Sequence, residues 1–266
     1  MSGEAGARTG GRRIAVLLEY DGTAYRGSQY QENGPSIQKE LESAIQELTG
    51  QTVRAAFAGR TDAGVHALGQ VAAFDIESRL TAAGLVPGLN RFLPRDIAVR
   101  AATEVERGFD PRRDARSRVY RYRIDNRRVR SPLERDRVWH VPKLLDVAAM
   151  ERAAKRLEGA HDFAAFAGPF DGLTRRTLRR CEVTARCGRV LVEMEAQAFL
   201  PHQVRRTVGP LVEAGLGRMT DDALAALLEK AEPSSAGPAA PACGLYLVRI
   251  AYDGLDFGPD QGNGQS

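Results

Sequence analysis

The sequence predicts an α+β fold of two similar β-α-β halves, whose mixed or antiparallel sheets join around a central basic cleft. The first half shows the pattern most clearly. Residues 13–20 have the apolar pattern of a strand, and Ser36 can cap a helix whose apolar side chains recur on one face. Strand-like segments at 53–57 and 70–76 follow, so the apolar stripe of the helix has a sheet face to cover.

The remaining elements follow the same two periodicities. Helices are expected at 81–93 with an interruption near Pro87, at 145–158 with Gly159 as the stop, at 204–215, and after Thr220. Strands are expected at 97–105, 116–125, 178–186 and 189–196, and from Gly244 onward. We therefore divide the chain into a flexible N-terminus (1–11), a first half (12–108), a second half (109–252) and a flexible tail (253–266).

The composition excludes several protein classes. Apolar residues make up 43% of the 266 residues, enough for a substantial core. No apolar run approaches the roughly 20 residues of a membrane-spanning helix, and the N-terminal segment lacks the apolar stretch of a secretory signal. Cys181, Cys187 and Cys243 form neither a paired metal motif nor a disulfide framework, so we expect a protein of the reducing cytoplasm.

Arginine is concentrated in two segments, although the net charge is only +4. Nine arginines lie within residues 112–130, and a second cluster comprises Arg175, Arg176, Arg179 and Arg180. The guanidinium group binds phosphate in a planar, bidentate geometry that Lys cannot match. A solvated surface would also carry charge, but the clustering favours a surface that binds a phosphate backbone.

The segment between strands 53–57 and 70–76 contains the strongest candidate for chemistry. Gly59 and Gly64 bracket a single carboxylate, Asp62, and Arg60 lies two residues before it. Glycine permits backbone conformations and close approaches that a Cβ would prevent, so this loop can present Asp62 to a bulky ligand. A tight turn in which Asp is only a turn former explains the spacing equally well.

This loop resembles the signature of a known family. Gly59 to Ala67, with the sequence Gly-Arg-Thr-Asp-Ala-Gly-Val-His-Ala, and the Gly69-Gln70-Val71 that follows resemble the tRNA pseudouridine synthase A family. Segments 20–23, 27–31 and 199–209 extend the resemblance, which spans residues 13–252. The chain departs from the family pattern at Ser28, Gln203 and Cys243, where the family usually carries Trp, Met and Pro.

The resemblance implies roles for several residues. Asp62 would be the catalytic carboxylate, and Arg205 the basic residue that pairs with it. Tyr120 would lie over the target base, and Phe109 and Arg112 belong to a segment associated with tRNA contact. Arg60 is an additional candidate, either for the RNA backbone or for holding the target nucleotide out of its stack.

The strand pattern around Tyr120 is compatible with two interpretations. Alternation places Arg118, Tyr120, Tyr122 and Ile124 on one face of the strand at 116–125. Tyrosines favour strands, so this face could be ordinary sheet surface. An aromatic ring beside cations is also what stacking on a nucleobase requires.

Two function classes remain, an RNA-modifying enzyme and a non-catalytic RNA-binding protein of the same fold. Asp62 separates them, because a pure binder gains nothing from a carboxylate aimed at a polyanion. Conversion of uridine to pseudouridine is redox-neutral, so we expect no cofactor. The four histidines lie at spacings that do not suggest a metal site, and we expect no metal.

The expected function is therefore isomerisation of uridine in tRNA. The resemblance implies uridines at positions 38 to 40 of the anticodon stem-loop, in the standard tRNA count. It also implies a homodimer that binds one tRNA across both subunits. Asp62 could attack C1′ of the ribose or remove a ribose proton, and the residues do not decide between these routes.

Overall fold

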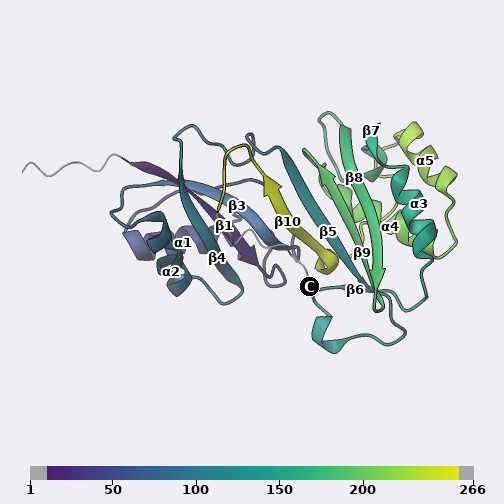
Figure 1. Cartoon of the computed structure of the whole chain (residues 1–266), viewed down its shortest axis with the longest axis horizontal. Coiled ribbons are helices and arrows are strands. Elements are labelled where there is room, and N and C mark those ends of the chain that lie inside the picture. The colour runs from purple at the N-terminus through teal and green to yellow at the C-terminus, as the bar shows by residue number, and fades with distance from the viewer. Residues whose placement is uncertain (1–10, 258–266) are drawn as a thin grey trace, which may run out of the picture.

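A computed structural model describes residues 11–257, which form a mixed sheet with helices packed near its two ends (Figure 1). The main path of the sheet runs β4-β1-β3-β10-β5-β9-β8-β7, with β2 paired to β3 and β6 paired to β5. The predicted α+β class with a mixed sheet is confirmed. The flexible segments expected at the termini lie outside the described residues for 1–10 and 258–266.

The first half contributes one end of this sheet. Its elements are β1 (Arg12–Tyr20), α1 (Ile37–Thr49), β2 (Ala56–Phe57), β3 (His66–Ile76), α2 (Ala82–Phe92) and β4 (Ile97–Val105). Strand β1 lies between β3 and β4 and is antiparallel to both. Ser36 caps α1 by accepting a hydrogen bond from the Lys39 N–H, as expected, and Leu41 and Ile45 are buried in the core.

The second half contributes the other end of the sheet. Its strands are β5 (Ser117–Asp125), β6 (Trp139–His140), β7 (Gly159–Asp162), β8 (Arg175–Arg186), β9 (Arg189–Ala196) and β10 (Leu245–Ala251). Its helices are α3 (Val147–Lys155), α4 (Gln203–Gly215) and α5 (Asp221–Lys230), with short 3₁₀ turns at Pro132–Glu134, Ala164–Phe166 and Ala242–Gly244. Strand β10 is parallel to β3 and antiparallel to β5, and so joins the two ends into one sheet.

Several element boundaries differ from the prediction. The strand expected at 53–57 shortens to β2, whereas β3 begins earlier, at His66, because its first residues pair with Tyr246 and Leu247 of β10. Helix α2 continues through Pro87, since burial of Leu85 and Leu89 outweighs the lost hydrogen bond. Helix α3 ends at Lys155, and Gly159 instead opens β7 with a positive φ of 109°.

The alternation predicted for β5 determines which side chains lie over the sheet. Arg118, Tyr120, Tyr122 and Ile124 are all buried, whereas Arg121 is partly exposed. The hairpin between β8 and β9 turns at Cys187 and Gly188 as predicted, with φ values of 52° and 73°. Within residues 11–257, no helix has the length and apolar character needed to cross a membrane.

Candidate active site

Asp62 and Arg205 are brought together although they lie far apart in the sequence. Asp62 belongs to the loop between β2 and β3, and Arg205 to the first turn of α4. Arg205 Nη1 donates to Asp62 Oδ2 at 2.9 Å, and its Nε donates to the Ala240 carbonyl at 2.7 Å. The Arg205 side chain is 16% exposed and that of Asp62 is 32% exposed. The carboxylate therefore has a well-shielded cation beside it and remains open on its other side.

The sequence analysis missed a second partner of Asp62. His202 Nδ1 lies 2.9 Å from the same oxygen, Oδ2. His202 precedes α4 with φ 59° and ψ 2°, a left-handed conformation that is uncommon for a residue with a side chain. His202 lies within the segment that resembles the family, three residues before Arg205, but its spacing gave no sign of this contact.

The loop that carries Asp62 contains two glycines, which differ in backbone conformation and in their neighbours. Gly64 adopts φ 78°, as expected for a turn that only glycine enters without strain. Gly59 has no positive φ, and a Cβ placed on it would lie 3.6 Å from the Tyr120 hydroxyl. A Cβ at this distance makes an ordinary van der Waals contact, so neither the backbone angle nor the space beside Tyr120 requires glycine at this position.

The loop is held by hydrogen bonds to two residues that precede Asp62, Gly59 and Thr61. Gln70 of β3 accepts from the Gly59 N–H at 3.3 Å and donates to the Gly59 carbonyl at 2.8 Å. The Tyr20 and Thr61 hydroxyls are 2.8 Å apart, and the Thr61 N–H donates to Ser28 Oγ at 2.9 Å. These buried bonds fix the backbone next to Asp62, which a site that orients a reacting group requires.

Ser28 thus has a defined role although it departs from the family pattern. Its side chain is fully buried, and its own N–H donates to the Thr61 carbonyl at 3.0 Å. Replacing Ser28 by Ala is expected to leave the Thr61 N–H buried without an acceptor, at a cost of about 1–3 kcal/mol. We therefore expect a lower melting temperature together with a lower single-turnover rate, because Asp62 follows Thr61 directly.

Ser36→Ala is the matched control for this prediction. Ser36 is also buried and accepts one backbone hydrogen bond, from Lys39 at 3.3 Å, but it caps α1. Its loss should lower the melting temperature by a similar amount while leaving the single-turnover rate near that of the unmodified protein. Equal effects of Ser28→Ala and Ser36→Ala on the rate would show that Ser28 serves the fold alone.

Tyr120 lies beside the loop with its hydroxyl unused. The ring is 8% exposed and meets Phe199 edge to face, with centroids 5.2 Å apart. Among the described residues the Tyr120 hydroxyl has no hydrogen-bond partner, whereas Tyr20, Tyr122, Tyr246 and Tyr252 each have one. Burial raises the pKa of Tyr120 well above its ordinary value, so at neutral pH the group is a phenol and not a phenolate.

A buried arginine connects the catalytic loop to the segment expected to contact tRNA. Arg118 is 7% exposed, and its Nη2 donates at 2.8 Å to both the Ala58 carbonyl and the Arg112 carbonyl. Phe109 packs on Tyr252 with centroids 5.3 Å apart, and its carbonyl accepts from Arg13. Phe109 and Arg112 therefore do not touch Asp62, but Arg118 ties their segment to the start of its loop.

The structure places seven of the nine arginines at 112–130 in two groups; of the other two, Arg118 is buried and Arg123 lies over the Tyr246 ring. Four of the seven are paired with acids inside the chain: Arg113 with Asp110, Arg116 with Asp253, Arg121 with Glu193 and Arg127 with Asp125. Arg112, Arg128 and Arg130 are exposed and form no ion pair with any acid among the described residues. Arg60 is likewise exposed and unpaired within residues 11–257. The candidates for phosphate contacts are thus fewer than the sequence suggested.

His66 is the first residue of β3 and holds the end of the loop that carries Asp62. It is 2% exposed and stacks on Tyr246, with ring centroids 4.7 Å apart. The Gly22 N–H donates to its Nδ1 at 3.1 Å, so Nε2 carries the proton and faces the Asp136 and Cys243 carbonyls at 3.0 and 3.2 Å. Burial lowers its pKa, and the neutral ring serves as a fixed bridge between segments distant in sequence.

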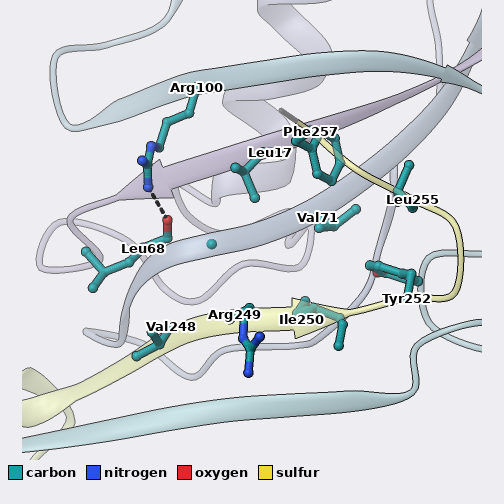
Figure 2. A pocket seen from close by; sticks show the side chains of 12 residues that line it. Leu17, Leu68, Val71, Arg100, Val248, Arg249, Ile250, Tyr252, Leu255 and Phe257 are labelled. Atoms are coloured by element: carbon teal, nitrogen blue, oxygen red, sulfur yellow. Dashed lines mark hydrogen bonds between the residues drawn. The ribbon is translucent and has the colours of Figure 1, made fainter. Parts of the chain in front are cut away.

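A pocket of about 200 Å³ lies away from this cluster (Figure 2). It is lined by β1, β3, β4, β10 and the segment that follows β10, including Leu17, Val71 and Ile250. Val71 follows Gln70 in β3, and neighbouring side chains of a strand point to opposite faces of the sheet. Because Gln70 holds the catalytic loop, the pocket lies on the face opposite Asp62, and none of the predicted site residues lines it.

Comparisons with known proteins identify the family of this chain. A family model described as tRNA pseudouridine synthase matches residues 16–112 and 153–253, and these segments include Asp62 and Arg205. The chain belongs to the tRNA pseudouridine synthase family. Tyr120 lies between the two matched segments, so the match says nothing of this residue.

Individual relatives of the family cover nearly the whole chain. A protein of Roseiflexus castenholzii named tRNA pseudouridine synthase A is 48% identical, over 95% of this chain and 93% of its own length. A protein of Myxococcus xanthus with the same name is 48% identical, over 90% of this chain and 92% of its own. One from Pelobacter propionicus, again so named, is 44% identical, over 91% of this chain and all of its own. The chain is thus an enzyme of tRNA pseudouridylation, an isomerase, and the non-catalytic alternative falls away.

Proposed function

We propose that this enzyme converts uridine to pseudouridine in the anticodon stem-loop of tRNA, at positions 38 to 40, with Asp62 as the catalytic residue. The observation that carries the assignment of the site is the contact between Asp62 and Arg205 beside a buried tyrosine with a free hydroxyl. The specificity for the anticodon stem-loop is supported by the resemblance of the loop and of segment 199–209 to the tRNA pseudouridine synthase A family.

The reaction breaks the N1–C1′ bond, turns the uracil and joins C5 to C1′; C5 loses a proton and N1 gains one, so the product is an isomer of the substrate. Asp62 supplies the carboxylate that this sequence needs, either as a nucleophile at C1′ or as a base toward the ribose. In both routes the carboxylate must be ionised, and its Oδ2 lies 2.9 Å from Arg205 Nη1. Both routes leave the protein without net chemical change.

Tyr120 has a narrower role than the sequence allowed. As a buried phenol it offers an aromatic edge and one hydrogen-bond donor to the uracil. It is poorly suited to take the C5 proton, because its raised pKa keeps the phenolate form scarce at neutral pH. We assign it to holding the base, together with Phe199, which packs against its ring.

Arg112 is proposed to contact a phosphate of the tRNA. Replacing Arg112 by Gln is expected to weaken tRNA binding and to flatten the slope of log affinity against log salt by about 0.7–0.9. Turnover at saturating tRNA should change little, because Arg112 has no contact with Asp62. Affinity measured at four or more salt concentrations, with the single-turnover rate, checks this expectation.

Arg113→Gln provides the matched control. Arg113 is adjacent and 85% exposed, but its charge is already paired with Asp110 at 3.0 Å. We expect its replacement to change the salt slope less than that of Arg112. If Arg112→Gln lowered the rate and left the salt slope unchanged, Arg112 would belong to the chemistry and not to phosphate binding.

The remaining proposals concern organisation. We propose that the halves 12–108 and 109–252 are two similar units. The family model matches two segments, 16–112 and 153–253, and nearly all of each segment lies in one half. We also propose a homodimer that binds one tRNA across both subunits, and a cytoplasmic location where its tRNA substrate lies. Analytical ultracentrifugation of the protein with and without tRNA tests the dimer.

We expect the reaction to need no metal or other cofactor, because the isomerisation is redox-neutral and Asp62 already has Arg205 as a cationic partner. Activity should therefore survive extensive dialysis against EDTA, with the tRNA folded beforehand. Loss of activity that returns only on adding Zn²⁺ or Mg²⁺ would contradict this expectation.

The target positions are tested by mapping pseudouridine at single-nucleotide resolution in tRNA transcripts incubated with the pure protein. Transcripts carrying uridine at 38, 39 or 40 should be modified there, and transcripts with cytidine at all three positions should stay unmodified. Modification confined to another part of the tRNA would contradict the proposed specificity while leaving the synthase activity intact.

A further inference from the structure

Asp62 receives both of its side-chain contacts on one oxygen. Arg205 Nη1 and His202 Nδ1 each lie 2.9 Å from Oδ2. Within residues 11–257, no hydrogen-bond donor is in reach of Oδ1. The two oxygens of this carboxylate therefore differ, since Oδ2 accepts a hydrogen bond from Arg205 and contacts His202 Nδ1, whereas Oδ1 is available to an incoming group.

Two contacts, the hydrogen bond from Arg205 and the close approach of the His202 ring, restrict the carboxylate more than one can. The last torsion of an Asp side chain is soft, so a single contact still allows the carboxylate plane to rock. Arg205 reaches Oδ2 from the first turn of α4, and His202 reaches it from the residue that precedes α4. Together they fix the direction in which Oδ1 points.

The position of His202 is itself held by its surroundings. A Cβ on Gly168 would lie 2.4 Å from His202 Cδ2, so the imidazole ring packs directly on the Gly168 backbone. The Gly168 N–H donates to the Pro201 carbonyl at 2.8 Å, which fastens this segment to the turn before α4. The ring thus lies between Gly168 and Asp62, with 39% of the His202 side chain exposed.

The backbone of His202 also indicates a role other than helix capping. His202 occupies the N-cap of α4, yet its side chain makes no capping hydrogen bond. Its left-handed conformation is uncommon for a residue with a Cβ, although Asn, Asp and His adopt it more often than the others. In this conformation the ring contacts Asp62 and makes no capping hydrogen bond.

We propose that His202 is a positioning residue which, together with Arg205, holds Oδ2 of Asp62 so that Oδ1 meets the target nucleotide. This inference rests on the proposed catalytic role of Asp62. His202 does not touch the reacting atoms in this scheme, and its effect on the reaction passes through the carboxylate.

Two substitutions at position 202 separate this role from a structural one. In His202→Asn the amide Nδ2 stands one bond from Cγ, as Nδ1 does in histidine, and Asn accepts the left-handed backbone. In His202→Gly the backbone is equally unstrained, but the donor is lost. We expect the Asn variant to keep a single-turnover rate within a few-fold of the unmodified protein, and the Gly variant to lose on the order of 10- to 100-fold.

The readouts are single-turnover rate at saturating tRNA, tRNA affinity and melting temperature. Affinity and melting temperature are expected to stay close to those of the unmodified protein in both variants, so the loss appears in the rate alone. Gly168→Ala provides an independent test, because the added Cβ would push the imidazole ring away from Asp62 although residue 202 is still histidine. It should lower the rate in the same way as His202→Gly.

The outcomes distinguish this inference from the assignment of Asp62. A full single-turnover rate in His202→Gly, or equal losses of rate in the Asn and Gly variants, would overturn the role of His202. If Asp62→Asn were inactive in the same assay, the assignment of Asp62 would still stand. An active Asp62→Asn would overturn both. If His202→Gly failed to fold, the rates of His202→Asn and Gly168→Ala would decide, and a full rate in Gly168→Ala would count against the proposal.

Discussion

Replacement of Asp62 by Asn is expected to abolish pseudouridine formation, with a loss on the order of 10³-fold or more in single-turnover rate. The two side chains have nearly the same shape, so the loop should keep its structure. The amide can neither attack C1′ nor accept a ribose proton, and its neutral oxygen binds Arg205 and His202 more weakly.

The fold and the tRNA affinity should survive this change. Thr61 and Gly59 hold the loop through Ser28, Tyr20 and Gln70, and none of these bonds uses the Asp62 side chain. Product is measured by mass-shift labelling of pseudouridine, and binding by filter retention. Residual activity within tenfold of the unmodified protein would remove Asp62 from the mechanism.

Replacement of Arg205 by Gln is expected to lower the single-turnover rate by about 10²–10³-fold. Asp62 would lose the cation 2.9 Å from its Oδ2, and the Ala240 carbonyl would lose a donor at 2.7 Å. The slope of affinity against salt should stay nearly unchanged, because this arginine is occupied within the protein. The single-turnover rate of Arg205→Lys should lie between those of the unmodified protein and Arg205→Gln, because lysine keeps the charge but lacks the planar guanidinium group.

Arg206 supplies the control for Arg205. It lies next along α4, about 100° around the helix, and its Nη1 donates to the Ser234 and Gly237 carbonyls rather than to Asp62. Arg206→Gln makes the same change of charge and should reduce stability more than rate. If Arg205→Gln altered only the salt slope, its assignment to Asp62 would be wrong.

The sequence predicted two kinds of feature in this site: those that follow from the alternation of a strand, and those that follow from the resemblance of segment 199–209 to the family. The alternation of β5 placed Arg118 and Tyr120 on one buried face, and the resemblance paired Arg205 with Asp62. Both features can be read from the order of the residues. The first follows from the two-residue repeat of a strand, and the second from a segment that resembles the family without gaps.

Contacts between distant segments could not be predicted in this way. Ser28 looked like a loss relative to the family pattern, yet its hydroxyl holds Thr61 across 33 residues of sequence. His202 reaches Asp62 only because its backbone takes the left-handed conformation, which no sequence pattern around it signals. The ion pairs of the cluster at 112–130 could not be predicted either, because Glu193 lies on another strand and Asp253 is 137 residues from its partner Arg116.

The central claim is that the target nucleotide meets Asp62 beside Tyr120. It is tested most directly by a structure of the protein bound to a tRNA whose target uridine carries an unreactive sugar. The claim predicts that uridine out of its stack, with C1′ about 3–3.5 Å from Asp62 Oδ1 and the base against Tyr120. A uridine still stacked in the RNA, or bound in the pocket on the opposite face of the sheet (Figure 2), would contradict it.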